Sequence, residues 1–408
     1  MVGETRGLAA VLANAASPPG LARIAIDALS QVVGGGVSVA RDLTEAMAQE
    51  SPETRFTLFC VSDSLASTRF PDNVDVAHRP ELGSLLLRLR WEQFELPSLL
   101  AKDGYDALLG LGGYAIFRSP IPQVSVWQNS NVFTRVPVAR TLVVDLYIRV
   151  QRIVQAWSMP RAEMNVFITR DSLEEAGTRW AMDRVAHTVI PHGLREPAAA
   201  ASTTGASPAP DAPYVLTVGH LFFHKNFETL IEAAALYRQR FGEPPRILVA
   251  GGVVDQAYRD RLEDKIAAEG LEDVIRFLGA QRPEEVAALY GGARAYVTTS
   301  LLESFGFTPL EAMSHGVPVL AGRASCIPEV CGDAALFCDP RDPTDVAEQL
   351  HLLLEDEGLR SELVARGRAR ARDFSWSRSA RAYLDTLEDS VRTSRRTDGS
   401  SRGGPQAR

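Results

Sequence analysis

Short runs of Val, Ile and Leu alternate along most of this chain with longer stretches in which apolar residues recur at helical period. The runs in the first half are 23–27, 55–60, 106–111, 123–127, 164–168 and 186–190, and those in the second half are 214–218, 246–250, 274–278, 295–299 and 317–320. Strands that are apolar throughout and separated by helices belong to parallel sheets covered on both faces. We therefore expect an α/β fold with two doubly wound, Rossmann-like domains whose sheets face a central cleft.

The segment between these two series of strands is rich in Ala, Ser, Thr and Pro and shows no apolar period. Such a composition indicates a linker. We place it at 196–213, between an amino-terminal domain at 23–195 and a carboxy-terminal domain at 214–373. Residues 1–22 are predicted to be a disordered leader, and the polar segment 391–408 a disordered tail.

Charge and cysteine content exclude several function classes. The 43 basic residues are outnumbered by 51 acidic ones, so general attraction to nucleic acid is not expected. No run approaches the roughly 20 apolar residues that a membrane-spanning helix needs. The four cysteines form no CxxC pair, which favours reduced, buried thiols in a cytoplasmic protein, and we expect no metal site and no cofactor.

Ligands of doubly wound folds bind beyond the carboxyl ends of the strands, and three loops there stand out. Gly34, Gly35 and Gly36 follow the first strand, where glycine and a helix N-terminus suit an anion, although a tight turn explains them equally well. Lys225 begins a later helix, where a cation is unfavourable unless an anion is shared. A solvated lysine beside an Asn226 cap is the alternative.

The third loop, after the predicted strand 295–299, carries two glutamates. Thr308, Pro309 and Glu311 match a capping box, which gives Glu311 a structural explanation. Glu303 has none. A carboxylate among backbone N–H groups suits a ligand with several hydroxyls, so the loop predicts a sugar site.

Glu303 and Glu311, in the frame E-S-F-G-F-T-P-L-E-A-M, resemble the E-x7-E signature of retaining glycosyltransferases of family 4, which have the GT-B architecture. Further similarities follow in the family's order, strongly from Tyr214 to Asp342 and more loosely before it. They are Gly219 and Leu221, Lys225-Asn226, Gly251-Gly252, Phe277-Leu278-Gly279, Gly316-Val317-Pro318-Val319, and Ser325 with Pro328-Glu329-Val330.

The resemblance implies roles for individual residues. Glu303 would contact hydroxyls of the donor sugar, Glu311 the nucleotide ribose, and Lys225 the donor diphosphate; we assign catalysis to Glu303 and Lys225. Residues 374–390 would form a helix that crosses back to the first domain. The remaining predicted donor-binding residues are Gly34, Gly35, Gly36, Gly219, His220, Gly251, Ser304, Phe305, Gly306, Phe307, Thr308, Leu278 and Gln128.

Two positions depart from the family pattern. His220 stands where many members have an arginine, and Gln128 where they often have a histidine. A neutral histidine replaces a diphosphate contact only weakly. Gln128 would have to contact the donor sugar through its amide.

The resemblance implies transfer of a sugar from a nucleotide-activated donor to an acceptor hydroxyl, with retention and without a metal. The chain has no Asp-x-Asp cluster to hold a cation on the diphosphate. UDP and GDP donors both remain open, with a lean to the mannosyl type. A nucleotide-sugar epimerase of the same architecture and a non-catalytic nucleotide-sugar-binding protein are the alternatives.

The acceptor is open among a lipid-linked saccharide, a polysaccharide and a small metabolite. Leu82, Leu85, Leu86 and Leu89 recur at helical spacing near Arg88 and Arg90. This helix is expected to pack its leucines on the sheet. The alternative is peripheral contact with the inner face of an anionic membrane. Oligomeric state is not indicated.

Overall fold

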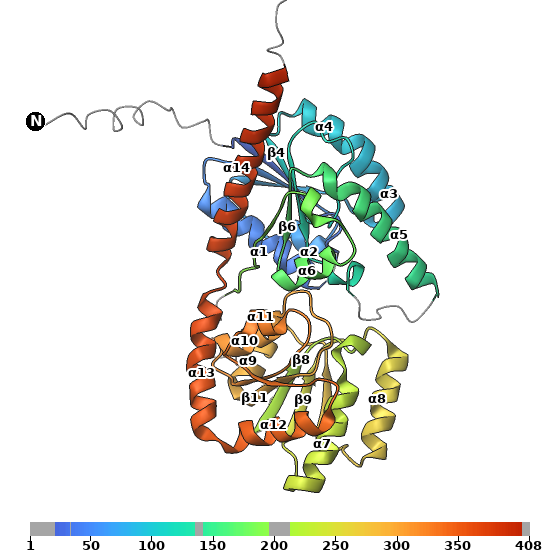
Figure 1. Ribbon diagram of the computed structural model, residues 1–408, viewed down its shortest axis with the longest axis vertical. Helices are drawn as coiled ribbons and strands as arrows, with labels where there is room; N and C mark the ends of the chain where they lie inside the picture. Colours follow the sequence, from blue (N-terminus) through green and yellow to red (C-terminus); the bar gives the residue numbers. More distant parts are fainter. Residues whose placement is uncertain (1–20, 33, 135–141, 196–212, 402–408) are drawn as a thin grey trace, which may run out of the picture.

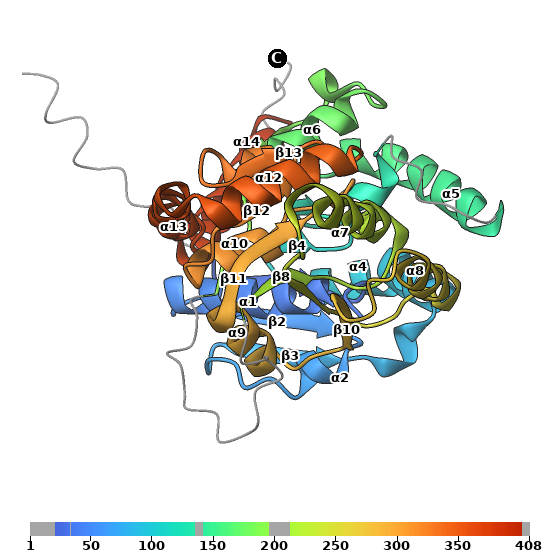
Figure 2. The same cartoon turned by 90° about the horizontal axis from the view of Figure 1, so that it is seen from below.

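Two parallel sheets flanked by helices make up the fold, as the computed structural model of residues 21–32, 34–134, 142–195 and 213–401 shows (Figures 1 and 2). The first sheet has the strand order β3-β2-β1-β4-β5-β6-β7 and the second β10-β9-β8-β11-β12-β13. All the pairings between these strands are parallel. The predicted α/β class with two doubly wound sheets is confirmed.

The strands of the first sheet are β1 (Arg23–Asp27), β2 (Arg55–Cys60), β3 (Val74–His78), β4 (Ala107–Gly110), β5 (Gln123–Trp127), β6 (Met164–Phe167) and β7 (His187–Val189). Those of the second are β8 (Tyr214–Val218), β9 (Arg246–Ala250), β10 (Ile275–Gly279), β11 (Ala293–Thr298), β12 (Val319–Gly322) and β13 (Leu336–Cys338). The sequence predicts neither β3 nor β13. Both are edge strands; β3 is interrupted by the exposed Asp75, and β13 is apolar but only three residues long.

The α-helices among the described residues are α1 (Gly35–Glu50), α2 (Asp63–Ala66), α3 (Leu85–Arg90), α4 (Leu96–Lys102), α5 (Leu142–Ser158), α6 (Arg170–Gly177), α7 (Phe227–Phe241), α8 (Gln256–Ala268), α9 (Pro283–Gly292), α10 (Phe307–Ser314), α11 (Ile327–Cys331), α12 (Pro343–Glu355), α13 (Glu357–Arg372) and α14 (Trp376–Ser401). Single turns of tighter or wider helix are η1 (Pro80–Gly83), η2 (Trp91–Glu95), η3 (Ser130–Val132), η4 (Met159–Arg161), η5 (Met182–Arg184) and η6 (Phe223–Lys225).

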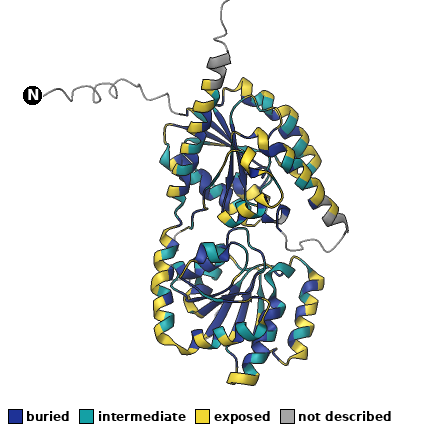
Figure 3. Cartoon of the chain, in the orientation of Figure 1, coloured by how far each residue is buried: buried dark blue, intermediate teal, exposed yellow. Residues whose placement is uncertain are grey.

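The core lies between the sheets and their helices, because the central strands are buried on both faces (Figure 3). Ile24 and Ile26 of β1 and Val215 and Leu216 of β8 are fully buried. The four cysteines are buried free thiols, as expected. None of the helices in the described part of the chain is long and apolar enough to cross a membrane.

Helix α14 crosses back onto the first sheet's helices, as the resemblance implies (Figure 1). Glu50 at the end of α1 pairs with Arg381 at 2.6 Å and accepts a hydrogen bond from Ser377. The predicted end at 390 and the disordered tail from 391 differ from the structure, because α14 continues to Ser401. Val391 extends the helix's buried stripe, and Arg395 reaches Asp106 at 3.3 Å. The predicted leader at 1–22 and linker at 196–213 lie almost wholly outside the described residues.

The carboxyl ends of the two sheets face each other. The backbone N–H of Ser130, after β5, donates to Ser304 Oγ at 3.3 Å, and Ser325 Oγ donates to Asp171 in α6 at 3.4 Å. Glu329 of α11 accepts the backbone N–H groups of Arg170 and Asp171 at 2.8 and 2.9 Å. A carboxylate from one half therefore caps a helix of the other, which fixes how the post-strand loops meet.

Three segments meet closely where the two halves join: His192-Gly193, the start of α10 at Phe307 and the start of α14 at Trp376. A Cβ on Gly193 would lie 2.3 Å from the backbone nitrogen of Trp376, so only glycine fits there. The ring of His192 stacks on Phe307 and lies 5.6 Å from that of Trp376. Burial lowers the pKa of His192 to about 3, so the ring is neutral and packs as an aromatic side chain.

Candidate functional site

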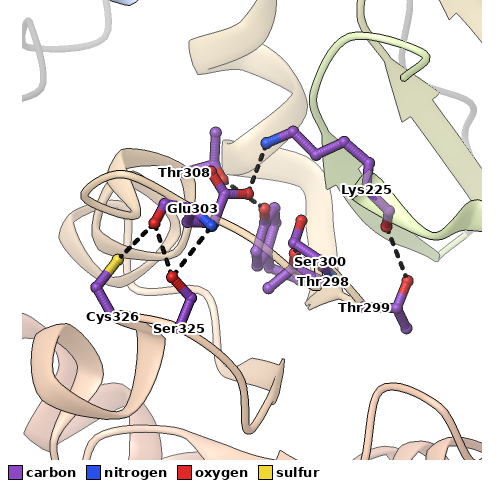
Figure 4. Close-up of polar contacts among 9 residues, drawn as sticks. Lys225, Thr298, Thr299, Ser300, Glu303, Thr308, Ser325 and Cys326 are labelled. Atoms are coloured by element: carbon purple, nitrogen blue, oxygen red, sulfur yellow. Dashed lines mark hydrogen bonds and ion pairs between the residues drawn. The ribbon is translucent and has the colours of Figure 1, made fainter. Parts of the chain in front are cut away.

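Lys225 and Glu303 form an ion pair at the carboxyl end of the second sheet, with Nζ 2.6 Å from Oε1 (Figure 4). Lys225 ends the turn η6 before α7, and Glu303 lies in the loop after β11. The two side chains keep only 16% and 15% of their surface exposed. The sequence predicts both residues separately as site residues, and the structure brings them together.

The surroundings of Glu303 favour its ionised form. Burial alone would raise the pKa of its carboxyl group, but the charge of Lys225 and hydrogen bonds from Lys225 and Ser300 outweigh burial and lower it. At neutral pH the pair therefore consists of a carboxylate and an ammonium group. Each group compensates the charge of the other.

The backbone of Glu303 is held by the next post-strand loop. Ser325 Oγ donates to the carbonyl oxygen of Glu303 at 2.8 Å, and Cys326 Sγ donates to the same oxygen at 3.3 Å (Figure 4). Ser325 has φ of 52°, in the left-handed region that L residues rarely adopt. The strained conformation of Ser325 places its hydroxyl between Glu303 and Asp171, so the loop that carries Glu303 is coupled to the opposite sheet.

Glycines allow the backbone to approach closely beside the ion pair. A Cβ on Gly251 would lie 1.9 Å from the carbonyl oxygen of Gly219, and a Cβ on Gly219 would lie 3.1 Å from Cε of Lys225. His220 lies next to Gly252. The predicted residues Gly219, His220 and Gly251 therefore gather around Lys225.

Helix α10 begins earlier than the sequence predicts. Its N-cap is Gly306, with φ of 87°, and Phe307 is its first residue, so Thr308 is not the N-cap and the predicted capping box is wrong. The Thr308 hydroxyl instead accepts a hydrogen bond from Tyr296 at 2.8 Å. The glycine C-terminal to the bulky Phe305 permits the left-handed turn that starts the helix one residue before Thr308. The N-terminal amides of α10 are thus available near the loop of Ser304 and Phe305.

Glu311 is anchored by Tyr290 of α9 rather than by the helix end. The Tyr290 hydroxyl donates to its carboxylate at 3.1 Å and equally to the carbonyl oxygen of Thr308. Burial raises the pKa of Glu311, against the smaller lowering effects of Tyr290 and His315. Tyr290 thus gives Glu311 a structural partner, and contact of Glu311 with a nucleotide ribose stays a prediction.

The predicted residues of the first sheet are less directly placed. Gly35 and Gly36 are in the first turn of α1, and Gly34 is its N-cap with φ of 71°. Gln128 Nε2 donates to the carbonyl oxygen of Leu111 at 2.9 Å. Contact of these four residues with a donor stays a prediction.

Two further residues lie near these loops. The predicted donor-binding residue Leu278 lies in β10, and Gln281 donates to its carbonyl oxygen at 2.9 Å. Burial, and then the charge of Lys225, lower the pKa of His224 to about 4. His224 is therefore neutral at pH 7.

Comparison with known proteins identifies the second half of the chain. Residues 205–370 match the family model of glycosyl transferases group 1. The chain carries a group 1 glycosyl transferase domain. An O-antigen chain mannosyltransferase B of Escherichia coli is 34% identical over 164 residues, which are 40% of this chain and 42% of that protein. A D-inositol 3-phosphate glycosyltransferase of Corynebacterium kroppenstedtii is 31% identical over 186 residues, 44% and 41% of the two chains. The matches thus span less than half the length of these relatives.

The whole fold also has a solved counterpart. A sucrose-phosphate synthase from Thermosynechococcus elongatus superposes with a TM-score of 0.70 at 20% identity, covering 91% of this chain and 100% of that one. The likeness confirms the predicted GT-B architecture. The hydrogen bonds from Ser130 to Ser304 and from Ser325 to Asp171 place the loop of Glu303 at the end of the second sheet that faces the first half.

Several residues that shape the group 1 domain's site carry no signal of their own in the sequence. Tyr290 and Tyr296 hold Glu311 and Thr308 from two different elements, and Ser130 reaches Ser304 across the two halves. Ser325 enters the sequence prediction through the family's order of motifs alone. Tyrosine and serine are common in every fold, so their presence in the sequence does not mark a site. Only their contacts with residues distant in the sequence, which the structure shows, identify them.

Proposed function

We propose that this chain is a retaining glycosyltransferase of family 4. It moves a sugar from a nucleotide-activated donor to an acceptor hydroxyl without a metal ion. The observation that carries the proposal is the partly buried ion pair of Lys225 and Glu303. A sugar nucleotide is a ligand that offers a diphosphate to the ammonium group and hydroxyls to the carboxylate at once.

The chemistry follows from the charges that develop. The bond between the anomeric carbon and the diphosphate oxygen breaks, and its electron pair stays on the diphosphate. Lys225 and the N-terminal amides of α10 stabilise that negative charge. The acceptor oxygen bonds to the anomeric carbon from the same face, and its proton passes to the leaving phosphate. No side chain is required as a general base, and Glu303 orients the sugar.

The donor is a UDP- or GDP-sugar, with a lean to the mannosyl type. The similarity to a mannosyltransferase over the group 1 domain supports that lean. The relatives differ in the acceptors their names imply, so the acceptor stays open among saccharides, lipid-linked saccharides and small molecules.

Two rival functions predict different products. An epimerase converts the donor alone into an isomer, whereas a binding protein leaves it unchanged. Glu303 would contact sugar hydroxyls in all three cases, so binding by itself does not separate them. Release of free nucleoside diphosphate that depends on an added acceptor marks the transferase.

The first test measures the thermal shift of the full chain with UDP, GDP, ADP and their common sugar conjugates, without divalent metal. A ligand that binds the folded state raises its apparent stability. We expect one sugar nucleotide to stabilise more than its bare diphosphate, and Glu303→Gln to abolish that preference. Stabilisation by none of them, or only with a metal, would refute the proposed donor site. Turnover of the stabilising donor, with mass analysis of the products, then decides among the three functions.

A further inference from the structure

Helix α5 exposes its large apolar side chains on the side away from the sheet. Leu146, Val150, Ile153 and Trp157 are between 51% and 67% exposed. At 100° per residue they fall within about 60° of the helix circumference and form one stripe. The opposite face is buried through Ile148, Gln155 and Ser158, two of which are polar. Packing among the described residues therefore does not explain the stripe.

A second exposed apolar group continues the stripe. The Trp157 carbonyl accepts a hydrogen bond from Arg161, whose guanidinium group lies over the Phe117 ring, 4.7 Å from its centroid. The Phe117 N–H donates to the Gln93 side chain at 2.9 Å, next to the exposed Phe94.

Helix α3 lies on the same side of the first sheet as α5 (Figure 1) and contributes the exposed Leu86 and Leu87. Leu82, just before α3, is buried, but α3 itself has no buried residue, so the prediction that this helix packs its leucines on the sheet is wrong for Leu86. We call the combined patch the side surface. It consists of Leu86, Leu87, Phe94, Phe117, Leu146, Val150, Ile153 and Trp157.

The charge around the side surface is opposite to that of the whole chain. Exposed arginines surround it at Arg90, Arg118, Arg149 and Arg161. Between residues 86 and 161, which include the whole side surface, the sequence has eight arginines and one lysine against three aspartates and two glutamates, although the chain carries a formal net charge of −8. An apolar stripe rimmed by arginines suits a surface that is apolar inside and anionic outside.

We propose that the side surface docks on a lipid bilayer with anionic headgroups. The apolar stripe enters the headgroup–acyl boundary, Trp157 and Phe117 lie at the interface, and the arginines meet the headgroups. A symmetric contact with a second copy would instead bury like charges against each other, because the same arginines would face their counterparts. Such docking goes beyond the proposed function. The narrower consequence that the acceptor is lipid-linked rests on that function.

Vesicle binding of the full chain tests this surface directly. We expect co-sedimentation with vesicles of phosphatidylcholine mixed with phosphatidylglycerol, weaker binding to phosphatidylcholine alone, and a blue shift of tryptophan fluorescence on binding. The double substitution Ile153→Ser and Trp157→Ser should reduce partitioning into the vesicles at least about tenfold, since it removes two apolar side chains that would insert into the bilayer. Arg118→Gln with Arg149→Gln should lower binding to the anionic vesicles and leave binding to the neutral ones unchanged.

Matched controls come from the other half of the chain. Val254→Ser with Leu352→Ser removes comparably exposed apolar side chains from the second sheet's helices and loops and should leave vesicle binding unchanged. Equal loss in that control, equal binding to both kinds of vesicle, or binding to neither would overturn the proposal. Dimers that the Ile153→Ser and Trp157→Ser variant abolishes, measured by sedimentation velocity without vesicles, would show that a second copy covers the surface. Nucleotide-induced thermal shifts, measured in parallel, report failure of the donor site independently.

Discussion

Removing the charge of Lys225 tests whether the site is built around a mutually satisfied ion pair. In Lys225→Met the carboxylate of Glu303 keeps its partly buried position and loses its counter-ion. Breaking a buried pair costs about 3–5 kcal/mol, whereas exposed pairs contribute about 0.2–1 kcal/mol. With about one-sixth of each side chain exposed, we expect the free energy of unfolding to fall by about 2 kcal/mol. For a domain of this size that lowers Tm by roughly 4–8 °C.

A second lysine–glutamate pair provides the control. Lys265 of α8 lies 2.7 Å from Glu232 of α7, but the two side chains are 28% and 41% exposed. Lys265→Met should therefore cost at most about 1 kcal/mol and leave nucleotide binding unchanged. Thermal denaturation of both variants measures how much each substitution lowers the free energy of unfolding. Equal losses in the two variants would refute the view that the partly buried pair contributes more stability than the exposed one.

The pH dependence of Lys225→Met gives an independent check of the sign. In the native protein the pKa of Glu303 is lowered, so its contribution is present above the ordinary glutamate pKa of 4.5 and is lost as pH falls through the lower folded value. Without Lys225, burial dominates and raises that pKa. The gap in Tm between the two proteins should therefore narrow below about pH 4.5. A gap that stays constant down to acid unfolding would contradict the assignment.

Ligand binding separates the two partners of the pair. Lys225→Met should weaken a bare nucleoside diphosphate roughly tenfold or more, since a hydrogen bond to a charged group contributes about 1.5–3 kcal/mol. Glu303→Gln should bind the same diphosphate as well as the native protein or better, because Lys225 is no longer held by a carboxylate. Titration calorimetry with UDP and GDP measures both. Loss of diphosphate affinity in Glu303→Gln would refute the competition between ligand and carboxylate.

Three further predictions concern other parts of the fold. Burial, followed by the charge of Asp27, raises the pKa of Glu92 to about 9, so the stability of the native protein should fall as pH rises from about 5 to 9. The Tm of Glu92→Gln relative to the native protein should therefore increase over that range. Parallel curves of Tm against pH for the two proteins would contradict this expectation. Gly251→Ala should lower the free energy of unfolding by more than about 2 kcal/mol, because the new Cβ meets a carbonyl oxygen. Gly35→Ala places its Cβ in open space, so the Tm of that variant should equal the native value. Its donor affinity should fall if the N-terminus of α1 contacts the donor. Glu329→Gln should weaken the cap on α6, lower Tm by a few degrees and increase the radius of gyration measured by X-ray scattering; an unchanged radius would show that other contacts hold the two halves together.

The sequence predicts the sheets well because central parallel strands are apolar throughout. It misses β3 and β13, which lie at sheet edges and need no continuous apolar run. The sequence also does not predict that the apolar face of α5 is exposed. Periodicity shows that a helix has an apolar face, but not whether that face points to the sheet or to the surface.

The candidate site divides in the same way. Glu303 and Lys225 stand out because each is a charge without a local structural reason, and the structure explains both by pairing them. Glu311 has a predicted local reason, a capping box, that is wrong because the N-cap of α10 is Gly306 and the helix starts at Phe307. Tyr290, which anchors Glu311, lies 21 residues away, and no local pattern reports a contact of that kind.

The ion pair also bears on how the proposed reaction cycle ends. A sugar nucleotide can compensate both partners, since its diphosphate meets Lys225 and its hydroxyls meet Glu303. After transfer, the remaining nucleoside diphosphate satisfies Lys225 alone and leaves a partly buried carboxylate without a partner, which is unfavourable. Lys225 can pair with Glu303 again at the 2.6 Å contact, and the diphosphate then loses its main cation. The same pair would therefore favour the intact donor over the spent one, and replacing Glu303 by an uncharged residue should slow product release by removing that competitor.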